Sequence, residues 1–430
     1  MIRRCGAVLA ICLMGAACQS LPYAGSGLPK IVPVQDGSEQ RRAINETIYD
    51  RTVSTVLDRF YDRTFNNVDF AAEAAARRSE AVNQPTERDF YGSLNGLLRL
   101  LEDSHTAAIR PRPYPEAIRS TGSGELSFGM DLVAGKDEDG VLRNYVRRLR
   151  PDGPAAALGV RPGWQIRSID GVAEGFNIGI EVGRSHTFEF RDPNGEVHVM
   201  TIPTTLFPFE TGYVERRADG VVVIAFESFD RTTADWLDAR LAELLADPPP
   251  AIVIDLRYNP GGSTDAAADM LGGFFTERFT FGQDGFRLRD RLEMGFWGTL
   301  PSNHTRPSGH VWTGPVAVLQ SSRSASSAEV FSAAMKHCGR AVIVGETSSG
   351  AVIGAVTFRL PDGGLLHVGI ADFRTATGAR LEKVGVEPDI HVVGGLQDLE
   401  TGGQILDDAA AQAALVAPAG AVCRPTSPEL

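Results

Sequence analysis

Residues Ser324 to Glu329 form a cluster of small hydroxyl side chains between an apolar segment and a segment that favours a helix. The apolar residues 316–320 are typical of a buried strand, and the helix is expected to run to His337. A serine at a helix N-terminus lies beside free backbone N–H groups, which favour developing negative charge. The pattern therefore suits a nucleophilic serine. It is also compatible with Ser326 and Ser327 acting only as helix caps.

Two glycine-containing segments accompany this cluster. Residues 251–262 read AIVIDLRYNPGG, a buried strand that runs into a turn, and residues 345–350 read GETSSG. In this order the three segments resemble the S41 family of serine peptidases, the tail-specific or carboxyl-terminal-processing proteases, over most of the chain. The resemblance implies that Ser326 is the nucleophile. It also implies that the glycine turn supplies an oxyanion-hole N–H, so we expect the donors to be Ser327 and either Gly261 or Gly262.

Position 351 departs from the pattern of many members of this family. Those members pair the serine with a lysine that follows G-E-x-x-x-G, and this chain has Ala351 there. The lysines of the chain are Lys30, Lys136, Lys336 and Lys383, and none stands in that motif. The base must therefore be another residue type, or the site is inactive. Histidine is the usual general base for serine.

His105 is the candidate base. It lies in LLEDSHT, residues 100–106, after a stretch whose apolar residues have helical spacing. This segment resembles the histidine-containing branch of the family, which is related to tricorn protease and the interphotoreceptor retinoid-binding protein repeats. That resemblance implies that Ser104 assists His105 and that Glu382 supports both. Taken alone, a histidine after a helix is also explained as a partner of the helix dipole.

The parallel α/β pattern covers the second half of the chain. Continuous apolar segments at 221–226, 252–256, 316–320 and 342–344 alternate with helical patterns, which favours buried parallel strands. The fold class is therefore α/β, and the resemblance implies a spiral core like those of crotonase and Clp protease. We expect this core over 212–400, after a helical cap over 39–118 and before a C-terminal helix and tail over 401–430.

A β-rich insertion is expected over 122–205. Residues 154–166 resemble the signature of PDZ domains, which bind an extended peptide at a sheet edge. The candidate loop for the peptide carboxylate contains Ser127, Phe128, Gly129 and Met130. The alternative is a module that only packs against the core.

The first residues are typical of a bacterial export signal. Residues 1–17 carry two arginines and then an apolar run, and residues 18–38 resemble a tether. Cys18 resembles a lipidation site, although plain cleavage after Ala17 stays open. We expect an exported, periplasmic protein anchored to the outer membrane through lipidated Cys18. The net charge of -12 argues against nucleic acid as a partner.

Two cysteines, Cys338 and Cys423, remain beyond the signal region. They could pair in an exported protein, or Cys338 could be a small buried residue. No metal-ligand spacing or organic cofactor motif is present, and the oligomeric state stays open.

Three functions fit these residues. The first is a serine endopeptidase that cleaves protein or peptide substrates through Ser326 and His105. The others are an inactive relative that binds peptides or a lipophilic ligand, and a hydrolase of non-peptide esters or amides.

Overall fold

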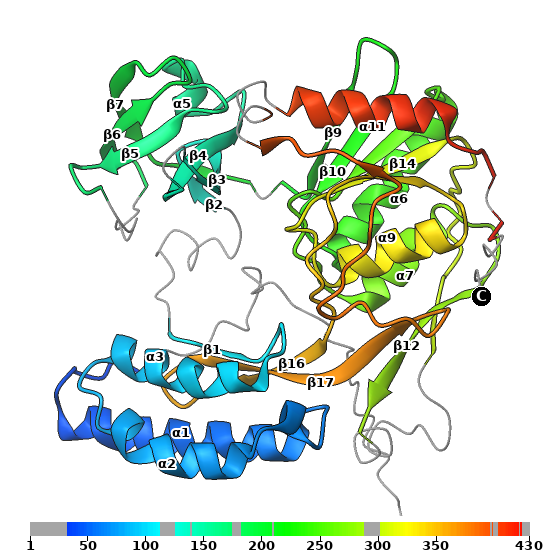
Figure 1. Ribbon diagram of the computed structural model, residues 1–430. Helices are drawn as coiled ribbons and strands as arrows, with labels where there is room; N and C mark the ends of the chain where they lie inside the picture. The colour runs from blue at the N-terminus through cyan, green and yellow to red at the C-terminus, as the bar shows by residue number, and fades with distance from the viewer. Residues whose placement is uncertain are drawn as a thin grey trace, which may run out of the picture.

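The computed structural model describes residues 32–111, 125–137, 140–173, 182–208, 210–287, 302–395, 398, 403–420 and 422–423. They form three parts, namely a helical layer backed by an antiparallel sheet, a small β-rich part and an α/β core (Figure 1). The expected signal sequence, Cys18 and most of the tether lie outside the described residues. Among the helices described, none has the length and apolar character needed to cross a membrane.

The helical layer consists of α1 (Glu39–Arg59), α2 (Phe70–Val82) and α3 (Glu87–Leu98), with short 3-10 helices η1 (Phe65–Asn67) and η2 (Arg99–Leu101). Each long helix follows a residue whose side chain accepts a backbone N–H of the first turn. These residues are Ser38, Asp69 and Thr86. Such caps satisfy donors that a helix start leaves free.

A five-stranded antiparallel sheet packs against this layer. Its strands are β1 (Ala107–Ile109), β12 (Thr280–Phe286), β13 (Ser302–His304), β16 (Gly354–Arg359) and β17 (Leu365–Thr375), and β17 pairs with β1, β12 and β16. Ala108, Leu366 and Val368 are buried in one cluster with the helices. The sequence analysis did not predict this sheet, because its strands come from distant parts of the chain. It joins the segment after the helical layer to the second half of the protein.

The β-rich part has its own apolar interior. Strands β3 (Met130–Lys136), β4 (Leu142–Leu149), β5 (Gln165–Ile169), β6 (Ser185–Arg191) and β7 (Val197–Pro203) pair in this order, and β2 (Glu125–Ser127) pairs with β8 (Thr205–Phe207). The short helix α5 (Pro154–Ala157) lies beside them. Trp164, which stands where PDZ signatures usually have aspartate, is a buried member of this interior and stacks on His198 with ring centroids 4.3 Å apart.

The α/β core contains a six-stranded sheet. Its order is β18 (Ile390–His391), β15 (Val342–Gly345), β14 (Val316–Gln320), β11 (Ile252–Asp255), β10 (Val222–Phe226) and β9 (Gly212–Arg216), with only β9 antiparallel to its neighbour. Helices α6 (Arg231–Ala246), α7 (Thr264–Gly272) and α9 (Ser327–His337) cover one face, and α11 (Gln404–Val416) covers the other (Figure 1). The predicted α/β fold class with buried parallel strands is therefore confirmed.

A disulfide joins Cys338 to Cys423, which decides between the two alternatives left open for these cysteines. Cys338 caps the C-terminus of α9, and Cys423 follows α11. The bridge therefore fastens the chain beyond α11 to the far end of the helix that begins after Ser326. A disulfide is typical of proteins that fold in an oxidising compartment.

Replacing Cys423 by alanine should lower the free energy of unfolding by about 2–4 kcal/mol, because the bridge closes a loop between residues separated by 85 positions. Urea unfolding of the purified protein measures this change. A reductant should lower the unfolding midpoint of the wild type and leave that of the variant unchanged. A wild-type midpoint that does not respond to reductant would contradict the prediction.

Candidate active site

Ser326 occupies a sharp turn between β14 and α9. Its backbone has φ 55° and ψ -120°, a conformation that non-glycine residues rarely adopt. Its N–H donates to the carbonyl of Ala351 at 2.8 Å and to the carboxylate of Glu329 at 3.0 Å. Strained backbone of this kind costs about 1–3 kcal/mol and persists only where its surroundings hold it. The sequence-predicted nucleophile is therefore a rigidly held serine at the start of a helix.

The turn that contains Gly261 and Gly262 lies directly against Ser326. A Cβ atom on Gly261, whose φ is 101°, would come within 2.6 Å of the Ser326 Cβ, so only glycine fits there. The Gly261 N–H already donates to Asn259 Oδ1 at 2.8 Å. Within the described part of the chain, the N–H groups of Gly262 and Ser327 hydrogen bond no protein group. Of the three predicted oxyanion donors, Gly262 and Ser327 are therefore the available ones.

His105, Ser104 and Glu382 form one hydrogen-bonded chain. The Ser104 Oγ lies 2.6 Å from His105 Nδ1 and 2.9 Å from Glu382 Oε2, and the Ser104 N–H donates to Glu382 Oε1 at 3.1 Å. An ionised carboxylate only accepts hydrogen bonds, so the single Ser104 hydroxyl proton points to Glu382. The Ser104 oxygen then accepts the His105 Nδ1 proton. This arrangement leaves a lone pair on His105 Nε2, the form that a general base requires.

The loop that carries His105 is folded around Asp103. The Asp103 carboxylate accepts the N–H groups of His105 at 2.9 Å and Thr106 at 2.6 Å, as well as the Thr106 hydroxyl. The Thr106 hydroxyl accepts the N–H of Gly369 on β17 at 3.0 Å. These bonds fix the position of the His105 backbone on the antiparallel sheet.

Burial, with a smaller contribution from the nearby His367, lowers the pKa of His105 to about 4. A buried imidazolium lacks the hydration that stabilises its charge in water, so the neutral ring is favoured. Near neutral pH the His105 side chain is therefore uncharged and able to accept a proton.

The peptide between Ala351 and Val352 connects the serine to the histidine group. The Ala351 carbonyl accepts the Ser326 N–H, and the Val352 N–H donates to Glu382 Oε2 at 2.9 Å. No hydrogen bond joins the His105 ring to the Ser326 side chain among the described residues. The Ala351–Val352 peptide group thus links Ser326 to the group formed by His105, Ser104 and Glu382. Ala351 stands where many members of the family have lysine, and it is part of this link.

Glu329 joins the loops around the serine, as expected of a carboxylate at this motif position that orients backbone and does not transfer protons. Its side chain is fully buried and accepts the N–H groups of Ser326, Gly350 and Ala351 and the hydroxyl of Ser348, at 2.6 to 3.0 Å. Burial raises its pKa, while these four donors oppose that shift. Glu329 therefore holds the backbone of Ser326 and of the 348–351 loop in place.

Residues 220–392 match the family model described as peptidase family S41. The core of this chain belongs to that family. The S41 match spans β10 to β18 and so includes Ser326, the Gly261–Gly262 turn and Glu382, whereas His105 lies outside it.

Curated relatives extend the similarity beyond the matched core. A carboxyl-terminal-processing protease of Picosynechococcus sp. is 25% identical over 353 residues, which cover 78% of this chain and 80% of the relative. Carboxyl-terminal-processing peptidase 3 of Arabidopsis thaliana chloroplasts is 25% identical over 83% of this chain and 71% of its own length. Residues 220–392 therefore belong to peptidase family S41, and the chain is similar over most of its length to processing proteases from bacteria and chloroplasts.

Solved structures share the fold. The mature form of CPAF superposes with a TM-score of 0.58 over 87% of this chain and 97% of its own, at 14% identity. The photosystem II D1 C-terminal processing protease gives 0.52 over 81% and 92%, at 19% identity. Tricorn protease gives 0.51 over 87% of this chain and 37% of its own, at 16% identity. At these identities the similarity establishes the fold of this S41 peptidase alone.

The β-rich part contacts the turn that precedes Gly261. The guanidinium of Arg147 on β4 lies 4.2 Å from the centre of the Tyr258 ring and forms an ion pair with Glu227, which follows β10. Arg323, three residues before Ser326, donates to the carbonyl of Ala134 on β3. The module therefore contacts both loops that shape the S41 site.

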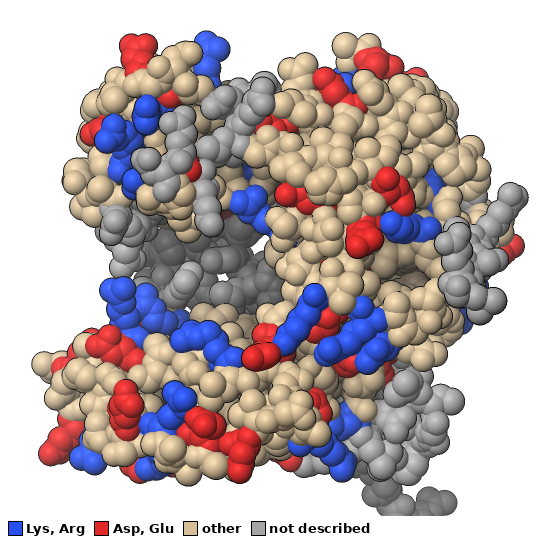
Figure 2. All heavy atoms as spheres, viewed as in Figure 1, with Lys and Arg blue, Asp and Glu red and all other residues tan. Residues whose placement is uncertain are grey.

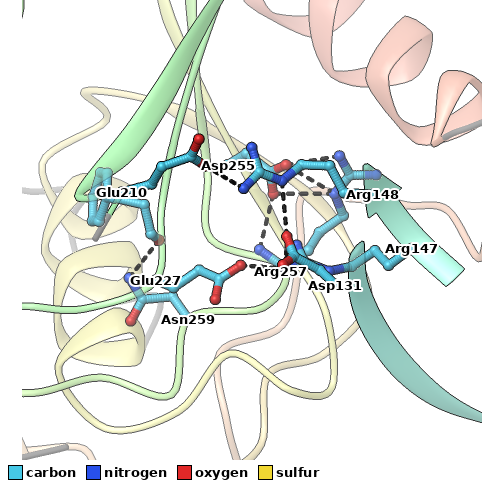
Figure 3. A network of polar contacts seen from close by, with 9 residues as sticks. Asp131, Arg147, Arg148, Glu210, Glu227, Asp255, Arg257 and Asn259 are labelled. Atoms are coloured by element: carbon cyan, nitrogen blue, oxygen red, sulfur yellow. Dashed lines mark hydrogen bonds and ion pairs between the residues drawn. The ribbon is translucent and has the colours of Figure 1, made fainter. Parts of the chain in front are cut away.

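Ion pairs continue from β4 across this junction (Figure 3). Arg148 pairs with Asp131 at 2.9 Å and with Glu210 in the segment between β8 and β9, and Arg147 also pairs with Asp131 at 3.3 Å. Charged groups of opposite sign thus alternate between the β-rich part and the chain that leads into the core.

A buried cluster of ion pairs lies at the end of β11, just before the turn that contains Gly261 and Gly262. Arg257 pairs with Asp255 at 2.7 Å and with Asp407 of α11, also at 2.7 Å. Burial raises the pKa of Asp407 to about 6, although Arg257 opposes the shift. This cluster fixes the end of β11 against α11, so its charges act on the structure of the turn.

The predicted peptide-binding loop, Ser127 to Met130, lies between β2 and β3. Phe128 is buried with its ring edge toward Phe188, and its carbonyl accepts the Ala155 N–H. The Gly129 N–H donates to Ser127 Oγ at 3.1 Å. β3 is the edge strand of its sheet, so an extended peptide could pair there. The peptide-binding role of this loop stays a prediction.

One described group has the composition of a metal site, namely Asp192, Glu196 and His198. Asp192 and Glu196 lie in the turn between β6 and β7, and His198 lies on β7. Oδ1 of Asp192 accepts the N–H groups of Asn194 and Glu196, and its Oδ2 lies 3.3 Å from His198 Nε2. These bonds account for the arrangement as part of the turn.

Proposed function

We propose that this S41 peptidase is an exported serine endopeptidase in which Ser326 is the nucleophile and His105 is the general base. The hydrogen-bonded chain from His105 Nδ1 through Ser104 to Glu382 is the observation that carries the proposal. It directs the basic Nε2 away from Glu382 and holds the imidazole in one tautomer. The absence of lysine at Ala351 leaves the histidine as the base.

Ser326 Oγ attacks the carbonyl carbon of the substrate peptide while its proton passes to His105 Nε2. The negative charge that forms on the carbonyl oxygen is stabilised by the N–H groups of Gly262 and Ser327. The C–N bond then breaks, and His105 gives its proton to the leaving amine. Water hydrolyses the acyl-enzyme by the same route and restores Ser326.

This mechanism requires the His105 ring to approach the Ser326 hydroxyl until the two side chains hydrogen bond. Catalytic hydrogen bonds are often long or absent without substrate and form in the bound complex. The loop before β1 and the Ala351–Val352 peptide both hydrogen bond to Glu382, so this side chain links the two groups that must approach each other.

Protein or peptide chains are the proposed substrates. The similar proteins are named for processing at carboxyl ends, so a carboxyl-terminal segment is the form of substrate we expect for this chain. The β-rich part, with its edge strand β3 and the loop from Ser127 to Met130, is the proposed binding surface for that segment.

Export and anchoring are also part of the proposal. Residues 1–17 have the character of a signal sequence, and Cys18 is the candidate lipidated residue. The disulfide between Cys338 and Cys423 supports folding outside the cytoplasm. We propose attachment to the outer membrane of a bacterium. Incorporation of radiolabelled palmitate into the wild type, and its loss after Cys18→Ser, would test this assignment.

Reaction with a fluorophosphonate probe tests the proposed chemistry. The wild type should be labelled on Ser326, and Ser326→Ala should not be labelled. A peptide library and an ester panel, tested in parallel, then separate proteolysis from general ester or amide hydrolysis. An unlabelled, correctly folded wild type would favour the inactive binding protein instead.

The pH dependence should reflect the low pKa of His105. Since the neutral imidazole is the base, kcat/KM should stay high as the pH falls through 6 and decline to half near pH 4. An unperturbed histidine would give this decline near pH 6.5. The measurement is kcat/KM for a library-selected peptide between pH 3.5 and 8, with circular dichroism at each pH to exclude unfolding. A half-maximum near pH 6.5 would contradict the prediction.

A further inference from the structure

A second histidine, His367, lies on the sheet that carries the His105 loop. Its neighbours on β17, Leu366 and Val368, are buried against the helical layer. Successive side chains of a strand point to opposite faces, so His367 lies on the face turned away from the helices. This face borders the hollow between the helical layer and the two other parts of the molecule (Figure 2).

The strand register brings His367 close to His105. His367 is opposite Ala107 in the antiparallel pair of β1 and β17. His105 lies two residues before Ala107, in the bend that leads into β1, and the nearby His367 contributes to the lowering of its pKa, so the two imidazoles are near one another. The Thr106 hydroxyl accepts the N–H of Gly369, which ties the segment between His105 and β1 to β17.

The His367 ring is held at one nitrogen. Its Nδ1 lies 2.8 Å from the hydroxyl of Thr357, the residue opposite it on β16. Among the residues that the structure describes, no protein group hydrogen bonds to His367 Nε2. Burial lowers the pKa of His367, so the ring is neutral near pH 7. A neutral imidazole can either donate to a peptide carbonyl or accept a peptide N–H through Nε2.

We propose that His367 is a substrate-positioning residue. With Nδ1 held by Thr357, its Nε2 hydrogen bonds the backbone of the bound peptide next to the peptide bond whose cleavage His105 assists. This inference rests on the proposed peptidase function and extends it, because it assigns the β1–β17 face as the floor on which the substrate lies. An extended peptide on this floor exposes one backbone N–H or C=O per residue to it, which suits a single uncharged hydrogen-bonding group.

Three substitutions separate a hydrogen bond from a packing role. The amide of His367→Gln reaches about as far as Nε2, the amide of His367→Asn reaches only about as far as Nδ1, and His367→Phe keeps the ring without either nitrogen. For the library-selected peptide, the Asn and Phe variants should raise KM about tenfold with little change in kcat, the size expected from one lost hydrogen bond. The Gln variant should stay within about threefold of the wild type.

The labelling rate of Ser326 by the fluorophosphonate probe is the second measurement. The probe is too small to extend along the sheet, so its rate should be the same in the wild type and all three variants. An unchanged KM in His367→Phe, a Gln variant no better than the Phe variant, or a labelling rate that falls together with peptide cleavage would each overturn the assignment. A wild type that is not labelled at all contradicts the peptidase chemistry itself, which is a distinguishable failure.

Discussion

Replacing His105 by alanine should lower kcat for peptide hydrolysis by about 10²–10⁴, the contribution expected of a positioned general base. The loss follows from the hydrogen-bonded chain that orients the ring, since Ser104 and Glu382 cannot themselves reach the position of Nε2. Steady-state kinetics with the library-selected peptide measure the change. The thermal unfolding midpoint should move little, because no other group depends on the His105 ring except the Ser104 hydroxyl.

His391→Ala is the matched control for this experiment. His391 is an exposed histidine on β18, so its removal should leave kcat and stability unchanged. A smaller loss is expected for Glu382→Gln, in which the His105 ring remains but its tautomer is less firmly set. A His105→Ala enzyme with wild-type turnover, or with undiminished fluorophosphonate labelling, would show that another group takes the serine proton.

Glu329→Ala should both destabilise the protein by about 2–4 kcal/mol and reduce peptide hydrolysis at least about a hundredfold. The substitution leaves the Ser348 hydroxyl and the N–H groups of Gly350 and Ala351 without their acceptor in a buried site. It also removes one of the two acceptors that hold the Ser326 backbone in its unusual conformation. Urea unfolding and steady-state kinetics on the same preparation measure the two effects.

Glu387→Ala provides the comparison, since Glu387 is an exposed glutamate and should change stability by no more than about 0.5 kcal/mol. Glu329→Gln keeps one acceptor oxygen and should fall between the wild type and the alanine variant in both measurements. A Glu329→Ala variant as stable and as active as the wild type would contradict this prediction. The remaining contacts at the start of α9 would then be enough to hold the Ser326 backbone.

The local elements of the site could be predicted from the sequence because each depends on neighbouring residues. A buried strand, a hydroxyl cluster and a helix start predict that Ser326 lies at a helix N-terminus, and an apolar strand that runs into Asn259, Gly261 and Gly262 predicts the turn beside it. The family pattern at 100–106 indicated Ser104 and His105. Residues at short separations leave such patterns, because strand and helix periods are properties of the local chain.

Contacts between distant segments were decided only by the tertiary structure. Ser104 and Glu382 are 278 positions apart. The resemblance to a family implied their association, but the hydrogen bonds between them come from the tertiary structure. The pairing of β1 with β17 brought His367 to His105, although His367 belongs to no motif. Asn259 Oδ1 accepts the Gly261 N–H, which leaves the N–H groups of Gly262 and Ser327 as the available donors. The pairing of Cys338 with Cys423 depended on where α11 packs. The amino-acid order determined which chemical groups are available. Which of them face one another depended on strand register and packing, because these are set by the burial of whole surfaces and not by adjacent residues.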